Sequence, residues 1–314
     1  MTRSIRGYII AMTGIVFWST TGTLISYLII HYHLAALTLA YWRGLFVCVA
    51  LGPTLFLFRR SLLRIRRADL GFFLLNGLIL AVFNSIWSVS VQANGAAVAT
   101  VLGYSSAGFT AILALWIFKE KLGPWKMLAI VLSLSGCVLV SNALDASMWQ
   151  LNPLGVITGL LSGLLFAFYS LMGKEAARRG INSWTAMLVS FFISTQFIML
   201  FNLLPFLPGA AGSLKAIWPH LALDGWGVLI LLSFGPTVLG FGLYNLAMNY
   251  LPAGTTNLLA TSEPAMTTLQ AYIFLGERMT LIQLIGSLVI LAAVFIVQLD
   301  EEKPLPEPGQ RNQI

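Results

Sequence analysis

The chain has 314 residues, of which 58% are hydrophobic and only 9% are charged, and its mean hydropathy is +0.86. Soluble domains carry roughly 25% charged residues, so this composition excludes a soluble globular domain and indicates a chain solvated largely by lipid. The formal net charge is +7, but the basic residues lie in short loops between apolar runs, which is typical of membrane proteins and not of a nucleic-acid-binding surface.

Ten apolar runs are long enough to cross a bilayer, which requires about 20 residues each. Turn-forming sequences separate several of these runs, including Ala93-Asn94-Gly95, Gly123-Pro124 and Leu251-Pro252. The sequence therefore predicts an all-α membrane protein with ten transmembrane helices. In chain order these are 7–30, 35–58, 69–91, 95–118, 124–141, 153–173, 183–205, 225–248, 252–275 and 280–299.

Lysines and arginines are distributed unevenly among the predicted loops. With the N-terminus placed in the cytoplasm, 15 of the 18 basic residues fall inside, Lys215 and Arg278 fall outside, and Arg43 lies within a span. Such a bias sets the orientation of a membrane protein. It predicts a multi-pass protein of the plasma membrane with both termini in the cytoplasm. The acidic, proline-containing segment 300–314 is expected to be a disordered cytoplasmic tail.

The two halves of the chain share a repeated segment. The segments Leu102 to Val140 and Leu259 to Val297 each consist of two apolar runs separated by a short charged segment. Equivalent positions in the two are 157 residues apart. Because each half has five predicted spans, an odd number, the second half must be inverted relative to the first. We predict one five-helix repeat over residues 1–146 and an inverted repeat over 147–299. This organisation is typical of secondary transporters, whose site lies between the repeats.

Polar and aromatic side chains recur on equivalent spans of the two halves. Lipid cannot satisfy their hydrogen bonds, so they are expected to face the interior of the bundle. A single Ser or Thr hydroxyl can simply join two helices, whereas the whole set indicates a cavity in which rings form apolar walls and cation–π faces and amides form hydrogen bonds. The expected substrate-binding residues are Trp18, Asn84, Trp87, Tyr104, Tyr169, Tyr244 and Asn245.

Two charged residues, Arg43 and Glu263, lie away from the ends of predicted spans. Glu263 is about 11 residues into its span, roughly 17 Å deep and close to the midplane, and Pro264 after it leaves the carbonyl of Ala260 without its helical donor. A buried glutamate suits proton coupling, but it can equally be a structural residue bonded to neighbouring helices. Arg43 lies roughly 12 Å below the outer surface, and the same two interpretations, coupling and structural anchor, apply to it.

The sequence lacks the residues that several classes of protein need for their function. There is no Gly-x-x-x-x-Gly-Lys-Ser/Thr loop, so ATP does not drive this chain directly. The three histidines fall in predicted outer loops, which leaves no intramembrane Ser/His pair or metal cluster. An enzyme acting on lipid-linked substrates would need an acid/base pair, and a channel would need a continuous polar path. We therefore expect no cofactor, no metal and no enzymatic activity.

The string Thr261-Ser262-Glu263-Pro264, followed by Phe274-Leu275-Gly276-Glu277-Arg278, resembles the hallmark of EamA-type members of the drug/metabolite transporter superfamily. Phe118-Lys119-Glu120-Lys121 and Arg43 also fit, and the resemblance covers residues 7 to 299. It departs at Ala107, where the first repeat of the family often has a proline. The resemblance implies a ten-helix inverted-repeat bundle, a central cavity lined by spans one, three, four, six, eight and nine, and often the export of amino acids or other metabolites.

Together these observations predict a secondary transporter that moves a small neutral or zwitterionic metabolite outward by alternating access. Aromatic or other large amino acids fit the expected cavity best, and proton coupling is one option for the driving force. A facilitative uniporter or exchanger, or an exporter of drugs or purines, remains an open alternative. The expected partners are the small-molecule substrate and the lipid bilayer, with the protein acting as a monomer or a homodimer.

Overall fold

The computed structural model of the protein describes residues 3–119, 123–140, 152–270, 273 and 280–301. In these ranges every regular element is helical. Two short 3-10 turns, η1 (Arg60–Leu63) and η2 (Arg67–Asp69), lie before α4, and a π-helical segment, η4 (Ser233–Phe241), lies between α9 and α10. The main helices are α1 (Arg3–Trp18), α2 (Thr21–Tyr32), α3 (Ala36–Phe58), α4 (Leu70–Gly103), α5 (Ser106–Ile117), α6 (Pro124–Val140), α7 (Pro153–Arg178), α8 (Ser183–Asn202), α9 (Leu223–Leu232), α10 (Gly242–Ala247), α11 (Ala253–Ala260), α12 (Glu263–Gln270) and α13 (Leu281–Glu301).

The outer faces of the bundle are apolar. Seven helical stretches among the described residues are long and apolar enough to cross a membrane, and α6 and α13 contain shorter apolar helices. Large hydrophobic side chains stand on the surface, with Leu223 90% exposed and Phe58 and Trp116 each 78% exposed. Exposing such area to water costs about 25 cal/mol per Å², whereas lipid solvates it. The fold is therefore that of an all-helical membrane protein, as the composition predicts.

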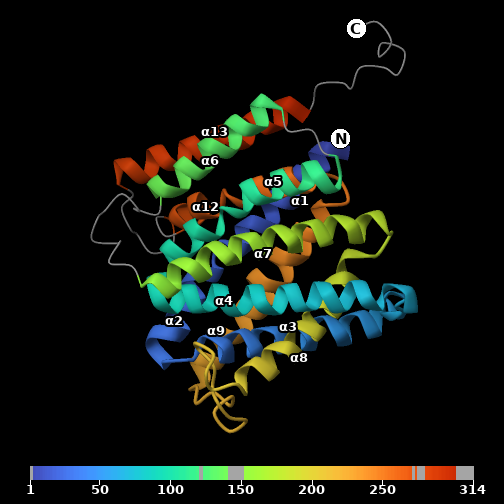
Figure 1. Cartoon of the computed structure of the whole chain (residues 1–314), viewed down its shortest axis with the longest axis vertical. Coiled ribbons are helices and arrows are strands. Elements are labelled where there is room, and N and C mark those ends of the chain that lie inside the picture. Colours follow the sequence, from blue (N-terminus) through green and yellow to red (C-terminus); the bar gives the residue numbers. More distant parts are fainter. Residues whose placement is uncertain (1–2, 120–122, 141–151, 271–272, 274–279, 302–314) are drawn as a thin grey trace, which may run out of the picture.

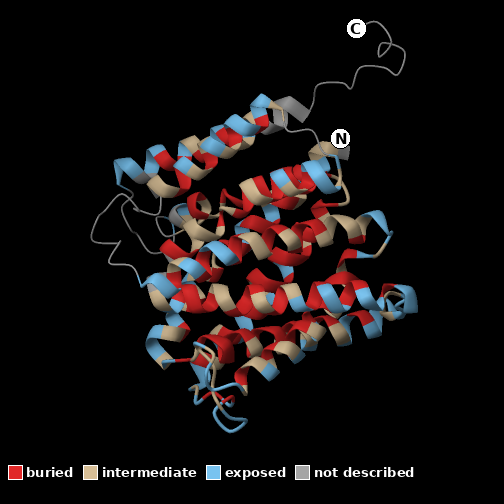
Figure 2. Ribbon diagram, viewed as in Figure 1, coloured by how far each residue is buried: buried red, intermediate tan, exposed pale blue. Residues whose placement is uncertain are grey.

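Helices that are distant in the sequence pack against each other throughout the bundle (Figure 1). α4 lies along α7 and α8, α5 packs against α7 and α11, and α1 packs against η4 and α10. α6 and α13 pair with each other at one edge of the molecule. Figure 2 shows buried residues concentrated on the central helices and exposed residues on the outer faces of α6 and α13. The centre of the bundle is thus built from both halves of the chain.

α4 contains a reversal of chain direction. Its 34 residues would extend about 50 Å in a straight helix. A Cβ atom added at Gly103 would nevertheless lie only 3.8 Å from the indole ring of Trp87, although a straight helix would separate these two residues by about 24 Å. The chain therefore reverses direction within α4, near the break expected at Ala93-Asn94-Gly95, without a separate loop between two helices.

Three predicted spans are broken helices, which corrects the expectation that each is continuous. The span expected at 7–30 is divided into α1 and α2, the span expected at 95–118 is interrupted at Tyr104-Ser105 between α4 and α5, and the span expected at 252–275 is divided into α11 and α12. In the gaps, Ser19 Oγ and Thr261 Oγ1 donate to carbonyls three residues earlier, at 2.7 and 2.6 Å. Hydroxyls that bond locally to the backbone compete with the helical hydrogen-bond ladder. These side chains therefore favour the breaks, although the apolar run continues through them.

The other predicted boundaries agree closely with the structure. Six helices start within one residue of the predicted positions, namely α3, α4, α6, α7, α8 and α13. α13 continues to Glu301, one residue into the predicted tail. The rest of that tail, residues 302–314, lies outside the described residues. So do Glu120-Lys121 and Phe274 to Arg278, which belong to the charged segments of the repeat.

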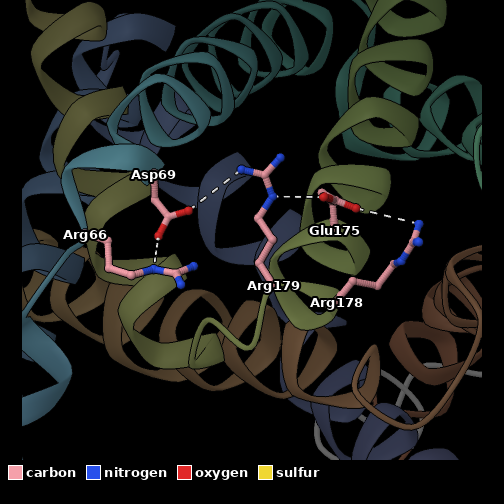
Figure 3. A network of polar contacts seen from close by, with 5 residues as sticks. All are labelled: Arg66, Asp69, Glu175, Arg178 and Arg179. Carbon is pink, nitrogen blue, oxygen red and sulfur yellow. Dashed lines mark hydrogen bonds and ion pairs between the residues drawn. The ribbon is translucent and has the colours of Figure 1, made fainter.

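Charged side chains join the turn before α4 to the end of α7 (Figure 3). Asp69, in η2, accepts from Arg66 Nε at 2.9 Å and lies 3.8 Å from Arg179 Nη1. Arg179 Nε also donates to Glu175 at 2.9 Å, and Arg178 Nη1 lies 3.8 Å from the same carboxylate. Asp69 is buried, but Glu175 and the three arginines are partly or largely exposed, and ion pairs with exposed partners contribute about 0–1 kcal/mol each. The network therefore aligns the two segments more than it stabilises the fold.

Candidate functional site

The broken helices meet around one central cavity. Trp18 ends α1 and Thr21 begins α2, while Phe241 ends η4 and Glu263 begins α12. Interrupted helices of this kind present free backbone groups and side chains at mid-depth in many transporters. The complete lining is Trp18, Thr21, Arg43, Phe83, Asn84, Trp87, Thr100, Gly103, Tyr104, Phe166, Phe241 and Glu263.

The cavity is small. Its volume is about 50 Å³, and a single water molecule needs roughly 10–15 Å³ on this measure. It therefore has room for only a few water molecules. A guest as large as an amino acid requires the side chains and helices around the cavity to move apart.

Four rings pack against one another at one side of the cavity, and we call them the aromatic floor: Trp18, Phe166, Phe241 and Tyr244. The centroid of Trp18 lies 4.4 Å from that of Phe241, 5.3 Å from that of Tyr244 and 5.5 Å from that of Phe166. Tilted and edge-to-face contacts at these distances are worth about 0.5–1.5 kcal/mol beyond the area that they bury. The floor is therefore a packed barrier and not a loose set of side chains.

Glu263 is one of two charged residues on the cavity wall. It is the first residue of α12, where the free N–H groups and the helix dipole favour an anion. The hydroxyl of Tyr104 donates a hydrogen bond to Glu263 Oε2 across the cavity. No basic side chain pairs with this carboxylate among the described residues. Its one side-chain partner is thus a neutral hydroxyl group.

Arg43 of α3 is the second charged residue, and its side chain is only 2% exposed. Arg43 Nη2 donates to Asn84 Oδ1, and Asn84 Nδ2 in turn donates to the carbonyl of Leu80 at 2.9 Å. The described part of the chain provides no carboxylate partner for this guanidinium group. Arg43 therefore points into the bundle and not toward the membrane surface.

The seven expected substrate-binding residues fall into two groups. Trp18, Asn84, Trp87 and Tyr104 border the central cavity. Tyr244 belongs to the aromatic floor, and Tyr169 and Asn245 lie beyond it, lining a second, smaller cavity of about 10 Å³. The structure thus brings four of these side chains together with Glu263 and Arg43, while Tyr244 is part of the aromatic floor and Tyr169 and Asn245 lie behind it.

Two buried hydrogen-bond networks contain the three expected residues that do not border the central cavity. Asn245 Nδ2 donates to Tyr169 Oη at 2.7 Å, and Tyr244 Oη lies 2.7 Å from Ser170 Oγ. Ser170 accepts from Asn257 Nδ2 at 3.0 Å, and Asn257 Oδ1 accepts from Ser106 Oγ at 3.0 Å. Each network links different helices, and the second joins α5 to α7, α10 and α11. Satisfied networks of this type make helix packing specific.

The predicted lining omitted three rings that border the cavity: Phe83, Phe166 and Phe241. Phe83 lies four residues before Trp87, and Phe241 lies three residues before Tyr244, so both share helical faces with residues that were selected. Helical spacing could have found them. Phenylalanine carries no polar atom, however, and on an apolar chain nothing separates a cavity-facing ring from a lipid-facing one.

Comparison with known proteins agrees with these features. Among curated relatives, the threonine/homoserine exporter RhtA of Escherichia coli is 28% identical over 228 residues, covering 69% of this chain and 67% of that protein. The uncharacterized transporter PA0485 of Pseudomonas aeruginosa is 26% identical and covers 97% of this chain and 98% of that protein. A solved crystal structure with 16% identity has a TM-score of 0.76 and covers 94% of this chain and 97% of that chain, which shows that the fold is shared.

The model of the EamA-like transporter family matches the chain twice, over residues 5–142 and 153–299. This finding confirms the resemblance drawn from the Thr261 to Pro264 string and its neighbours. Transporters bind a small-molecule substrate within a membrane, and the family and relatives are named for transport and not for catalysis. Because the match extends over both halves, the protein is a member of the EamA-like transporter family, within the drug/metabolite transporter superfamily.

Proposed function

We propose that this protein is a secondary transporter that exports small neutral or zwitterionic metabolites, amino acids above all, by alternating access. The observation that carries the proposal is the central cavity, whose wall combines aromatic rings with Glu263 and Arg43. Because the cavity holds only a few water molecules, a substrate enters only when helices around it move. The helix breaks beside Trp18 and Glu263 are natural hinges for that motion.

The architecture we propose is a ten-span bundle of two inverted repeats, residues 1–146 and 147–299, in the plasma membrane with both termini in the cytoplasm. The two separate family matches support the division, and the chain reversal inside α4 supports the third and fourth spans. In this orientation Tyr169 lies about 24 Å along α7 from its outer end, against about 10 Å for Arg43 along α3. The aromatic floor then closes the cytoplasmic side of the cavity.

The substrate class rests on chemistry and on relatives. Rings of Trp18, Trp87 and Phe166 offer apolar walls and cation–π faces for an ammonium group, and Asn84 offers an amide. Curated relatives such as RhtA carry the name of a threonine/homoserine exporter at 28% identity. We extend amino acid export to this protein as a proposal, with aromatic and other large amino acids included.

Glu263 supports proton coupling as the driving force. It is a carboxyl group on the wall of a cavity that must open to each side in turn, and its neutral partner Tyr104 leaves it free to exchange a proton. Facilitative exchange without protons is the second candidate. It is favoured if the Tyr104 bond serves only to hold α12 against the start of α5.

Transport by purified protein in proteoliposomes tests the proposal. Labelled L-threonine and L-phenylalanine are measured with and without an imposed pH gradient, and protein-free liposomes serve as the control. We expect movement of at least one amino acid and accumulation that depends on the gradient. Glu263→Gln should lose that accumulation but retain exchange at high substrate concentration. Wild-type protein that moves amino acids and ignores the gradient is a uniporter or exchanger, and protein that moves neither one contradicts the proposal.

A further inference from the structure

We propose that Arg43 and Glu263 together recognise the two charges of a zwitterion, so that the substrate is an α-amino acid held by its backbone charges. Arg43 binds the carboxylate, Glu263 binds the ammonium group, and the rings of the cavity receive the side chain. This inference rests on the proposed transport function and deepens it by assigning the groups that define the substrate class.

The first support is that both charges lack a counter-charge. Among the described residues, Arg43 bonds to the amide of Asn84 and Glu263 bonds to the hydroxyl of Tyr104, and neither forms an ion pair. Holding an unpaired charge away from water costs several kcal/mol. The two residues border the same cavity and yet do not pair with each other. A guest with one negative and one positive group would satisfy both at once.

The second support is the hydrogen-bonding capacity that remains at each end. A guanidinium group has five N–H donors, and the bond to Asn84 uses one of those on Arg43. Glu263 has two carboxyl oxygens, and Tyr104 donates to Oε2. The carboxylate of a substrate can accept hydrogen bonds from two further N–H groups of Arg43. The ammonium group of the substrate can donate a hydrogen bond to Glu263. Asn84 and Tyr104 thus engage only one Arg43 nitrogen and one Glu263 oxygen.

The third support is that the rest of the described wall carries no further charged group. Besides Arg43 and Glu263, it consists of aromatic rings and of uncharged residues such as Thr21 and Thr100. A molecule with only one charge leaves either Arg43 or Glu263 unpaired. A molecule with an additional charge finds no opposite charge on the wall. The cavity therefore selects one positive and one negative group with an uncharged remainder.

Binding by the purified full-length protein tests the assignment, with each amino acid compared with analogues that lack one charge. For L-phenylalanine these are 2-phenylethylamine and 3-phenylpropionate, and for L-threonine they are 1-amino-2-propanol and 3-hydroxybutyrate. Isothermal titration calorimetry gives the dissociation constants. In wild-type protein we expect one amino acid to bind about 10- to 100-fold more tightly than either analogue, the value of one hydrogen bond to a charged group.

The variants assign each charge to its residue. In Arg43→Gln the amino acid should bind no more tightly than the amine, because the carboxylate no longer adds affinity. In Glu263→Gln it should bind no more tightly than the acid. Arg64→Gln, which alters an exposed arginine, should keep the wild-type ratios. The ratio of amino acid to analogue affinity within one variant does not depend on how much protein that variant yields. Arg43→Lys keeps the positive charge but not the planar guanidinium group, and it should give an intermediate ratio.

Two outcomes overturn the inference. One is a wild-type protein that binds neither amino acid, or binds both no better than their analogues. The other is an Arg43→Gln variant that keeps the wild-type ratio of amino acid to amine affinity, even if both affinities fall equally. Transport of an analogue by wild-type protein would leave the proposed transporter in place while the zwitterion assignment fails. Amino acid binding with the expected ratios but without transport would contradict the transporter alone.

Discussion

At the scale of single residues, the bond between Tyr104 and Glu263 is the contact on which the cavity most depends. Tyr104 lies between α4 and α5, and Glu263 begins α12, so their hydrogen bond joins the two halves of the sequence across the site. Hydrogen bonds to charged groups contribute about 1.5–3 kcal/mol. The contact therefore has the strength to hold α12 against the α4–α5 junction on the wall of the cavity.

Tyr104→Phe removes the hydroxyl and keeps the ring. We expect the variant to fold, since Tyr104 packs in a cluster of buried rings, but to lower the rate of amino acid exchange by about tenfold, the equivalent of 1.4 kcal/mol. Exchange in proteoliposomes measures the change. Tyr41→Phe, on α3 next to Trp42, is the matched control and should behave as wild type. Equal rates in both variants would show that the hydroxyl does not contribute.

Trp87 and Tyr244 should differ in what they contribute, because one borders the cavity and the other anchors the floor. Trp87→Ala should weaken amino acid binding by about tenfold through loss of an aromatic wall, with little change in melting temperature. Tyr244→Phe should instead lower the free energy of unfolding by about 1 kcal/mol, since it loses the bond to Ser170. Titration calorimetry and thermal melts of the two variants separate the effects. A reversed pattern would mean that Tyr244, and not Trp87, contacts substrate.

At the scale of helices, close approach between α7 and the α4–α5 junction defines the cavity wall. A Cβ atom added at Gly163 would lie 3.0 Å from the carbonyl oxygen of Gly103 and 3.2 Å from that of Leu102. These are backbone atoms that cannot rotate away. The glycine therefore lets α7 approach a segment that carries Tyr104.

Gly163→Ala should consequently destabilise the protein by about 1–3 kcal/mol, the usual cost of overpacking. Gly108→Ala is the matched control on α5, where an added Cβ meets nothing within 4 Å, and it should be neutral or stabilising by up to about 1 kcal/mol. Thermal unfolding in detergent compares the two. If both alanine variants melt together, the close approach of α7 is not a constraint.

The helices were predictable from hydropathy because each uninterrupted apolar run had to match the bilayer thickness. Their interruptions were predictable only in part. Pro264 indicated a missing helical hydrogen bond at Ala260, where α11 ends, whereas the break at Ser19 depends on a local hydroxyl bond that competes with packing. For the site, alternating polar faces identified Asn84 and Trp87. The same rule selected Tyr169 and Asn245, which satisfy each other behind the rings. Sequence could place Arg43 at a depth but could not tell whether it turned inward.

At the scale of the whole molecule, the proposed orientation assigns the two ends of the bundle to opposite sides of the membrane. Arg64 lies near the charged network of Figure 3 in sequence, and Lys215 lies in the connection between α8 and α9. In a background of Cys48→Ala and Cys137→Ala, Arg64→Cys should react with an impermeant maleimide only in inside-out vesicles. Lys215→Cys should react only in right-side-out vesicles. Labelling of both from one side would contradict the alternating spans.

The small central cavity also has a consequence for the energy supply of the cell. A membrane that stores energy as a proton or ion gradient loses it through any continuous file of water. The cavity has room for only a few water molecules and four rings pack at one side of it, so this conformation offers no such file, because an apolar constriction expels water. Many copies can therefore reside in the membrane between transport cycles without short-circuiting it.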